Sequence, residues 1–88
     1  MLGGQKTCFL LLSQAVPQRL YYRRILGQTI RAYRKQAGLT QVKLAKRADL
    51  HHNFIGEVER GNMEISLGSL LKIAKALGVR VRDLVRDL

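Results

Sequence analysis

The chain has 88 residues, which is enough for one compact domain and too few for a second. Lysine and arginine outnumber aspartate and glutamate by 16 to 6, and the formal net charge is +10. Such an excess favours polyanionic partners, nucleic acid before an anionic membrane, the simpler alternative being solubility alone. The single cysteine, Cys8, excludes an internal disulfide, so we expect a reducing, cytoplasmic setting.

Residues 1–21 are predicted to be an N-terminal extension that precedes the domain. They contain the Gly3–Gly4 pair and the only proline, Pro17, and they sustain no helical period. The segment is compatible with a flexible arm, with an extra element packed on the domain, or with residues upstream of the natural start. Its apolar run over residues 8–12 is shorter than a secretory core of about 7–15 residues or a membrane span of about 20, so we expect neither.

From residue 22 onward the sequence predicts five short helices. The expected ranges are 22–37, 41–48, 52 to 59 or 60, 67–77 and 81–87. Thr40 and Ser66 stand where N-caps belong. Gly38, Gly61 and Gly78 follow the first, third and fourth helices, where a left-handed residue commonly ends a helix. No segment alternates long enough to predict a strand, so the fold class is all-α.

Apolar residues at three- and four-residue spacing predict the buried face of each helix. These residues are Ile25, Leu26, Ile30 and Tyr33; Leu44, Ala45 and Ala48; Phe54, Ile55 and Val58; and Leu67, Leu70, Leu71, Ala74 and Leu77. In the last helix Leu84 is expected to point inward, and Val81, Val85 and Leu88 form a second stripe. We interpret this stripe as a homodimer interface, the alternative being a longer core within one subunit.

Only residues 49–51 separate the second and third helices, and this spacing is typical of a helix-turn-helix. Around them, residues 38–45 (Gly-Leu-Thr-Gln-Val-Lys-Leu-Ala), 54–61 (Phe-Ile-Gly-Glu-Val-Glu-Arg-Gly) and 65–79 resemble the Xre family of Cro and lambda-repressor type regulators. The His-x-x-Phe-Ile and Glu-Arg-Gly-Asn patterns are most similar to restriction-modification controller proteins. The resemblance spans about residues 25–85 and implies a five-helix lambda-repressor-like domain that binds double-stranded DNA.

The third helix is then the expected recognition helix, with one face buried and the other turned to base edges. His51, His52, Asn53 and Glu57 are the predicted base contacts, because asparagine pairs with adenine and a carboxylate accepts from cytosine. The alternative is a solvated helix face with no special role. Gly56, in the middle of this helix, lets the backbone approach the groove or is a tolerated small residue.

Other residues are expected to hold the DNA backbone or the scaffold. The resemblance implies that Gln41 contacts a phosphate and braces the recognition helix, at a helix N-terminus that itself attracts anions. Further candidates for phosphate contacts are Lys43, Arg47 and Arg60, each equally well explained as surface charge. Arg34 and Glu59 match the partly buried salt bridge that the family forms between its first and third helices.

The sequence departs from the family where Asp49 replaces the usual turn glycine and His51 replaces the usual serine or threonine cap. The two adjacent histidines lack further ligands, so no metal or other cofactor is expected. No phosphate loop or activated nucleophile indicates an enzyme, and no small-molecule substrate is expected. The competing hypothesis is an antitoxin that binds a toxin protein and its own operator, with residues 9–12 as its anchor.

Overall fold

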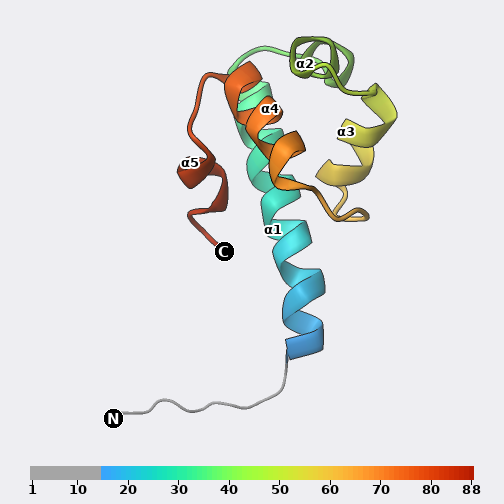
Figure 1. Cartoon of the computed structure of the whole chain (residues 1–88), viewed down its shortest axis with the longest axis vertical. Coiled ribbons are helices and arrows are strands. Elements are labelled where there is room, and N and C mark those ends of the chain that lie inside the picture. The colour runs from blue at the N-terminus through green and yellow to red at the C-terminus, as the bar shows by residue number, and fades with distance from the viewer. Residues whose placement is uncertain (1–14) are drawn as a thin grey trace.

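The computed structural model describes the backbone of residues 15–88 and the side chains of residues 21–88. This part of the chain holds α1 (Ala15–Gln36), α2 (Gln41–Ala48), α3 (His52–Glu59), α4 (Leu67–Leu77) and α5 (Val81–Val85), and it contains no strand (Figure 1). The all-α prediction is therefore confirmed. Cys8 and the expected toxin-binding anchor at residues 9–12 lie outside the described residues.

α1 begins at Ala15, so the predicted start at residue 22 was wrong. Pro17 lies in the first turn, where the missing N–H removes no helical hydrogen bond. The first turns of α1 extend beyond the other four helices (Figure 1), so they have no neighbouring element that would require an apolar face. A search for amphipathic periodicity therefore misses this part of the helix.

α5 ends at Val85, earlier than the predicted Asp87. The Asp83 carboxylate accepts a hydrogen bond from the Arg80 backbone N–H (3.0 Å) and so caps the start of the helix. At the other end the Leu88 N–H donates to the Val85 carbonyl (3.1 Å), which closes a turn after the last helical residue.

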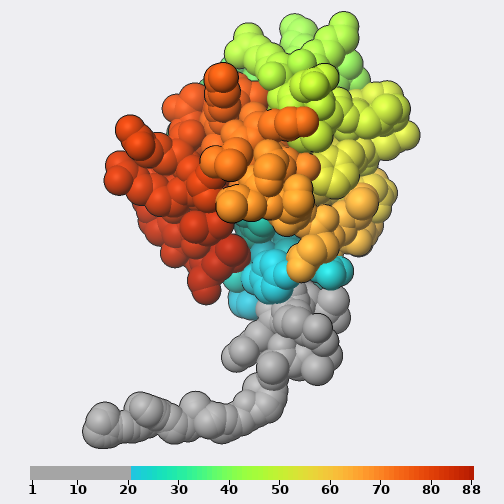
Figure 2. Space-filling model, in the orientation of Figure 1, coloured from blue at the N-terminus to red at the C-terminus, as the bar shows by residue number. Residues whose placement is uncertain are grey.

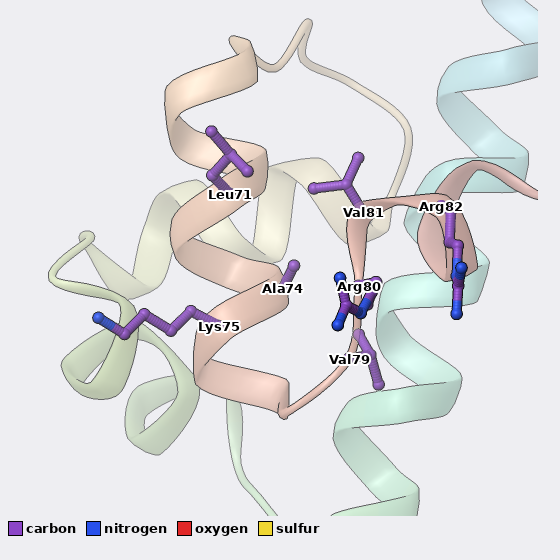
Figure 3. Close-up of a pocket in the computed structure, with 7 residues that line it drawn as sticks. All are labelled: Leu71, Ala74, Lys75, Val79, Arg80, Val81 and Arg82. Atoms are coloured by element: carbon purple, nitrogen blue, oxygen red, sulfur yellow. The ribbon is translucent and has the colours of Figure 1, made fainter.

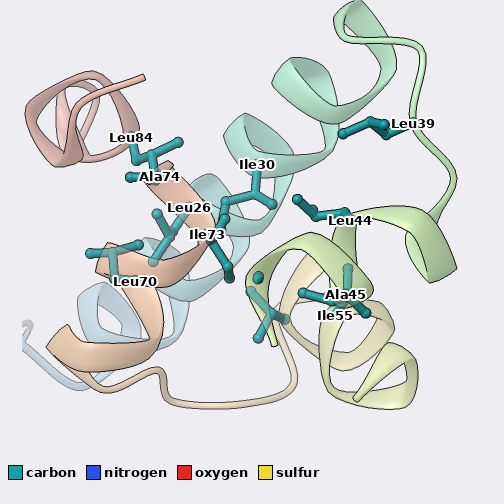
Figure 4. Packing of buried hydrophobic residues seen from close by; sticks show 12 residues of the cluster. Leu26, Ile30, Leu39, Leu44, Ala45, Ile55, Leu70, Ile73, Ala74 and Leu84 are labelled. Carbon is teal, nitrogen blue, oxygen red and sulfur yellow. The ribbon is translucent and has the colours of Figure 1, made fainter. Parts of the chain in front are cut away.

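The core takes one fully buried side chain from each helix: Ile30, Leu44, Ile55, Ile73 and Leu84 (Figure 4). Burying each of these contributes roughly 1.5–3 kcal/mol relative to leaving it exposed. The predicted inward position of Leu84 is confirmed. Because all five helices meet at this cluster, the orientation of α3 depends on the whole domain.

The buried face of α4 differs from the prediction. Leu67 and Leu71 are 66% and 52% exposed, whereas Ile73, absent from the predicted face, is fully buried. Leu70 and Ala74 are buried as predicted. The apolar stripe of α4 is wider than the face that the core covers, and the periodicity alone does not indicate which edge of it is buried. The uncovered edge leaves leucine side chains on the surface.

α1 and α3 cross in close contact at Gly27. A Cβ atom built at this position would lie 2.3 Å from the Val58 carbonyl oxygen and 2.7 Å from that of Glu59. Real Cβ atoms do not approach backbone atoms so closely, so a glycine is required for the two helices to pack at this separation. This crossing sets the position of the C-terminal half of α3.

Candidate nucleic-acid interface

α2 and α3 form the helix-turn-helix unit, and the turn between them depends on Asp49. This residue has left-handed backbone angles (φ 56°, ψ 48°), and its N–H caps the end of α2 by donating to the Ala45 and Lys46 carbonyls. Thr40 caps the start of α2, since its hydroxyl accepts from the Lys43 N–H at 3.1 Å. The aspartate therefore occupies a left-handed conformation that favours glycine.

α3 buries one side and exposes the other. Ile55 and Val58 are buried, whereas His52 and Asn53 are exposed. In Figure 2, α2 and α3 form the upper and right-hand part of the surface. The structure thus brings the predicted base-contacting residues at the start of α3 together on an open face.

His51 caps the N-terminus of α3. Its Nδ1 accepts a hydrogen bond from the Asn53 backbone N–H at 3.1 Å, and its ring stacks on that of His52 with the centroids 4.6 Å apart. The imidazole thereby takes the capping role that serine or threonine commonly has. The two rings and Asn53 form one polar cluster at the tip of the helix.

Gln41 is held by the buried ion pair. The Arg34 guanidinium binds the Glu59 carboxylate through two hydrogen bonds of 2.6 and 3.1 Å and donates a third to the Leu39 carbonyl (2.8 Å). Gln41 Nε2 donates to the same carboxylate at 3.0 Å. This network ties α1, α2 and α3 together and fixes the amide of Gln41 at the start of α2, close to the outer face of α3.

Glu57 and Arg60 bind each other. The Glu57 carboxylate accepts from Arg60 Nη2 and from Asn62 Nδ2, the latter at 3.2 Å. The hydrogen bond from Arg60 and then that from Asn62 hold the pKa of Glu57 below its usual value. Sequence reasoning placed Glu57 and Arg60 in separate roles and noted Asn62 only as part of the Glu-Arg-Gly-Asn pattern, without a role at the site.

The remaining phosphate candidates, Lys43 and Arg47, lie on α2. Lys43 is exposed on α2, beside the Thr40 cap. Arg47 lines a shallow hollow of about 440 Å³ between α2 and α4, and Lys72 and Lys75 contribute to the same hollow. Arg47 is therefore grouped with the basic side chains of α4, and no described contact joins it to the start of α3.

The loop that follows α3 is anchored to α1. Tyr22 Oη donates to the Glu64 carboxylate at 2.5 Å, and Arg23 Nε reaches the same group at 3.3 Å. The hydrogen bond to Glu64 raises the pKa of the Tyr22 hydroxyl. These contacts restrict the loop that carries Asn62, which contacts Glu57.

Of the predicted dimer residues, Val81 lines an apolar groove between α4 and α5. Val81 and Val85 are half-buried against the core, and Leu88 is 53% exposed. The groove has a volume of about 560 Å³, and Leu71, Ala74 and Val81 supply its apolar wall while Arg80 and Arg82 lie at its edge (Figure 3). Together with the exposed Leu67, it is an uncovered apolar area on the domain.

The described part of the chain offers neither a metal site nor a membrane span. Residues 15–88 contain no group of three or more histidine, cysteine or acidic side chains that could hold a metal ion. Over the same stretch no helix combines the length and the hydropathy needed to cross a membrane.

Comparison with known proteins supports the same interpretation. The helix-turn-helix family model matches residues 30–84. Control protein C.BamHI of Bacillus amyloliquefaciens is 42% identical over 64 residues, which cover 72% of this chain and 79% of that protein. The immunity repressor protein of Bacillus phage phi105 is 42% identical over 62 residues, which cover 70% of this chain and 43% of that protein.

A solved structure confirms the arrangement of the helices. The restriction-modification controller protein C.AhdI from Aeromonas hydrophila superposes with a TM-score of 0.70 at 39% identity, covering 70% of this chain and 94% of that one. The matched family, the regulators among the relatives and the exposed recognition helix agree. The chain belongs to the helix-turn-helix family of DNA-binding transcriptional regulators, to which restriction-modification controller proteins also belong.

Proposed function

We propose that this regulator binds a palindromic operator in the major groove as a homodimer and so controls transcription. The observation that carries the proposal is the exposed start of α3, where His51, His52 and Asn53 form one polar cluster on a helix whose opposite face is fixed in the core. Asparagine recognises adenine through two hydrogen bonds in the major groove. We therefore assign base contacts to this cluster.

Phosphate contacts are assigned to α2. The N-terminus of α2 offers free backbone N–H groups, and the Gln41 amide beside it is held in place by Glu59. Lys43 is exposed next to this end of the helix. Such contacts set the register of the protein on DNA, and Arg47 adds to the general attraction for the backbone.

Footprinting on the DNA upstream of the protein's own gene tests this function. Wild-type protein should protect a defined site, with affinity that falls steeply as salt is added. The substitution Asn53→Ala should weaken binding to that site by about 1–3 kcal/mol and change binding to random DNA little. Gln36→Ala removes an exposed amide in a groove between α1 and α5 and should leave both affinities unchanged. Equal protection of all sequences by the wild type would contradict the proposal.

The dimer interface is assigned to the groove between α4 and α5, together with Val81, Val85 and Leu88. Exposed leucines next to a groove are unfavourable in water, and a second copy would cover them. A two-fold dimer would place its recognition helices about 34 Å apart, one turn of DNA.

Sedimentation velocity tests the assembly. Leu71→Asp places a charge in the groove and should convert a wild-type dimer to a monomer that binds the full palindrome weakly. Val42→Asp changes an equally apolar, 46% exposed residue on α2 and should leave the dimer intact. A monomeric wild type, or an unchanged mass for Leu71→Asp, would refute this interface.

A further inference from the structure

The guanidinium of Arg60 lies over the middle of α3. Arg60 is the C-cap of the helix, and its side chain turns back toward the N-terminus, as helical side chains do. A Cβ atom built at Gly56 would lie 3.4 and 3.5 Å from the two terminal nitrogens of Arg60. The same point is 3.5 Å from Gln41 Oε1. The guanidinium therefore lies over Gly56, in a shallow seat that leaves room for a methyl group beneath it.

This seat is on the outward face of the helix. Asn53 and Arg60 are seven residues apart, which is close to two full turns at about 3.6 residues per turn, so they point the same way. Ile55, Val58 and Glu59 are buried on the opposite side. Arg60 thus shares the direction of the residue to which base contact is assigned, and it stays 58% exposed.

Glu57 braces the guanidinium. It binds Arg60 Nη2 with one carboxylate oxygen and Asn62 Nδ2 with the other. An exposed ion pair of this kind contributes little to stability, so its main effect is to orient the side chain. Arginine has five N–H donors in a planar fork, and a pair of them remains for a second partner. A carboxylate paired in this way also meets the negative phosphates with its charge compensated.

We propose that Arg60 reads a guanine in each half-site and that Glu57 is a positioning residue for it, which does not itself contact cytosine. The inference rests on the proposed function. Guanine presents O6 and N7 in the major groove, and a planar guanidinium accepts this pair through two parallel hydrogen bonds. A methyl group at Gly56 would only touch the guanidinium at ordinary van der Waals distance, whereas a longer side chain would compete with Arg60 for the seat.

A phosphate contact is the other role open to Arg60, and Arg60→Lys separates the two. Lysine keeps the charge but lacks the planar fork, so a phosphate contact would survive while guanine recognition would weaken. Each guanine in the footprint is replaced in turn by 7-deazaguanine, which lacks the N7 acceptor. Binding of the full-length wild type should fall about tenfold at one guanine per half-site, whereas the same replacement should not affect Arg60→Lys.

The positioning role of Glu57 has its own test. Glu57→Gln should lose part of the sensitivity to 7-deazaguanine while keeping its circular dichroism spectrum and thermal midpoint. Arg86→Lys is the matched control, because Arg86 pairs with Asp83 on α5 at the same three-residue spacing. Arg86→Lys should bind the unmodified operator and the 7-deazaguanine operator as the wild type does.

The outcomes separate the two proposals. If the wild type selects an operator but shows no dependence on guanine N7, or if Arg60→Lys matches it on both DNAs, the guanine contact is refuted and the regulator assignment stands. If Arg60→Ala weakens operator and random DNA equally and lowers the salt slope by about one, Arg60 contacts phosphate. If the wild type selects no sequence at all, the proposed function fails and this inference fails with it.

Discussion

Asp49 has a left-handed backbone, which residues other than glycine, asparagine and aspartate seldom adopt, and it connects the two helices of the motif. Its carboxylate also lies at the C-terminus of α2, where the helix dipole disfavours negative charge. Asp49→Gly should therefore raise the free energy of unfolding by about 0.5–1 kcal/mol, whereas Asp49→Ala should lower it by about 1 kcal/mol. Urea denaturation of the two variants checks the difference in sign. A stabilising alanine would show that the backbone here is not left-handed.

The pKa of the Glu57 carboxyl group is predicted to lie below its ordinary value of 4.5, because Arg60 and Asn62 bind the charged form of the group. A lowered pKa means that the bonds stabilise the fold above the ordinary carboxyl pKa and are lost as the pH falls through the folded-state value. An NMR titration of the Glu57 carboxyl carbon measures this directly. In Arg60→Ala the pKa should rise toward 4.5. The same pKa in both proteins would contradict the contact seen in the structure.

At the scale of elements, the crossing of α1 and α3 depends on Gly27. Gly27→Ala places a methyl group against two backbone carbonyls, which cannot move without separating the helices, so the free energy of unfolding should fall by roughly 2–3 kcal/mol. Gly68 in α4 is the matched control, since the nearest atom to a Cβ there is 3.9 Å away. Gly68→Ala should stabilise the protein by up to about 1 kcal/mol. Similar losses in both variants would contradict a tight crossing.

The Arg34–Glu59 pair connects the same two helices through charge. Arg34→Ala strands a carboxylate whose side chain is 2% exposed, and it should cost about 3–5 kcal/mol. The double variant Arg34→Met with Glu59→Leu removes both charges and should cost less than Arg34→Ala alone, because no unpaired charge remains. Chemical denaturation of the two variants tests this order. A double variant that loses the sum of both single effects would show that the two charges are not coupled.

The elements that the sequence predicts well are those with local boundary signals. α2 and α4 begin after Thr40 and Ser66, whose hydroxyls cap them as expected. The start of α1 lacks such a signal, because proline is tolerated in a first turn and the projecting turns need no apolar face. The exposure of Leu67 and Leu71 depends on how α4 rotates against the core, which periodicity does not define.

The site was predictable only in part for a similar reason. The exposed position of Asn53 and the buried pair of Arg34 with Glu59 follow from the motif and its spacing. The contact between Glu57 and Arg60 depends on side-chain direction, and the seat over Gly56 depends on where Gln41 lies in space. A sequence pattern carries neither kind of information. The glycine in the middle of α3 was visible in the sequence, but its contact with Arg60 was not.

At the scale of the whole molecule, the formal charge of +10 on the 88-residue chain supplies attraction to DNA, and the buried cluster that all five helices share holds α3 in a fixed orientation. The most direct test is NMR mapping of the backbone amides as an operator duplex is added. We predict that the largest shifts fall on residues 51–57 and at the start of α2. Shifts confined to α5 and the C-terminal half of α1, with α3 unchanged, would contradict the account.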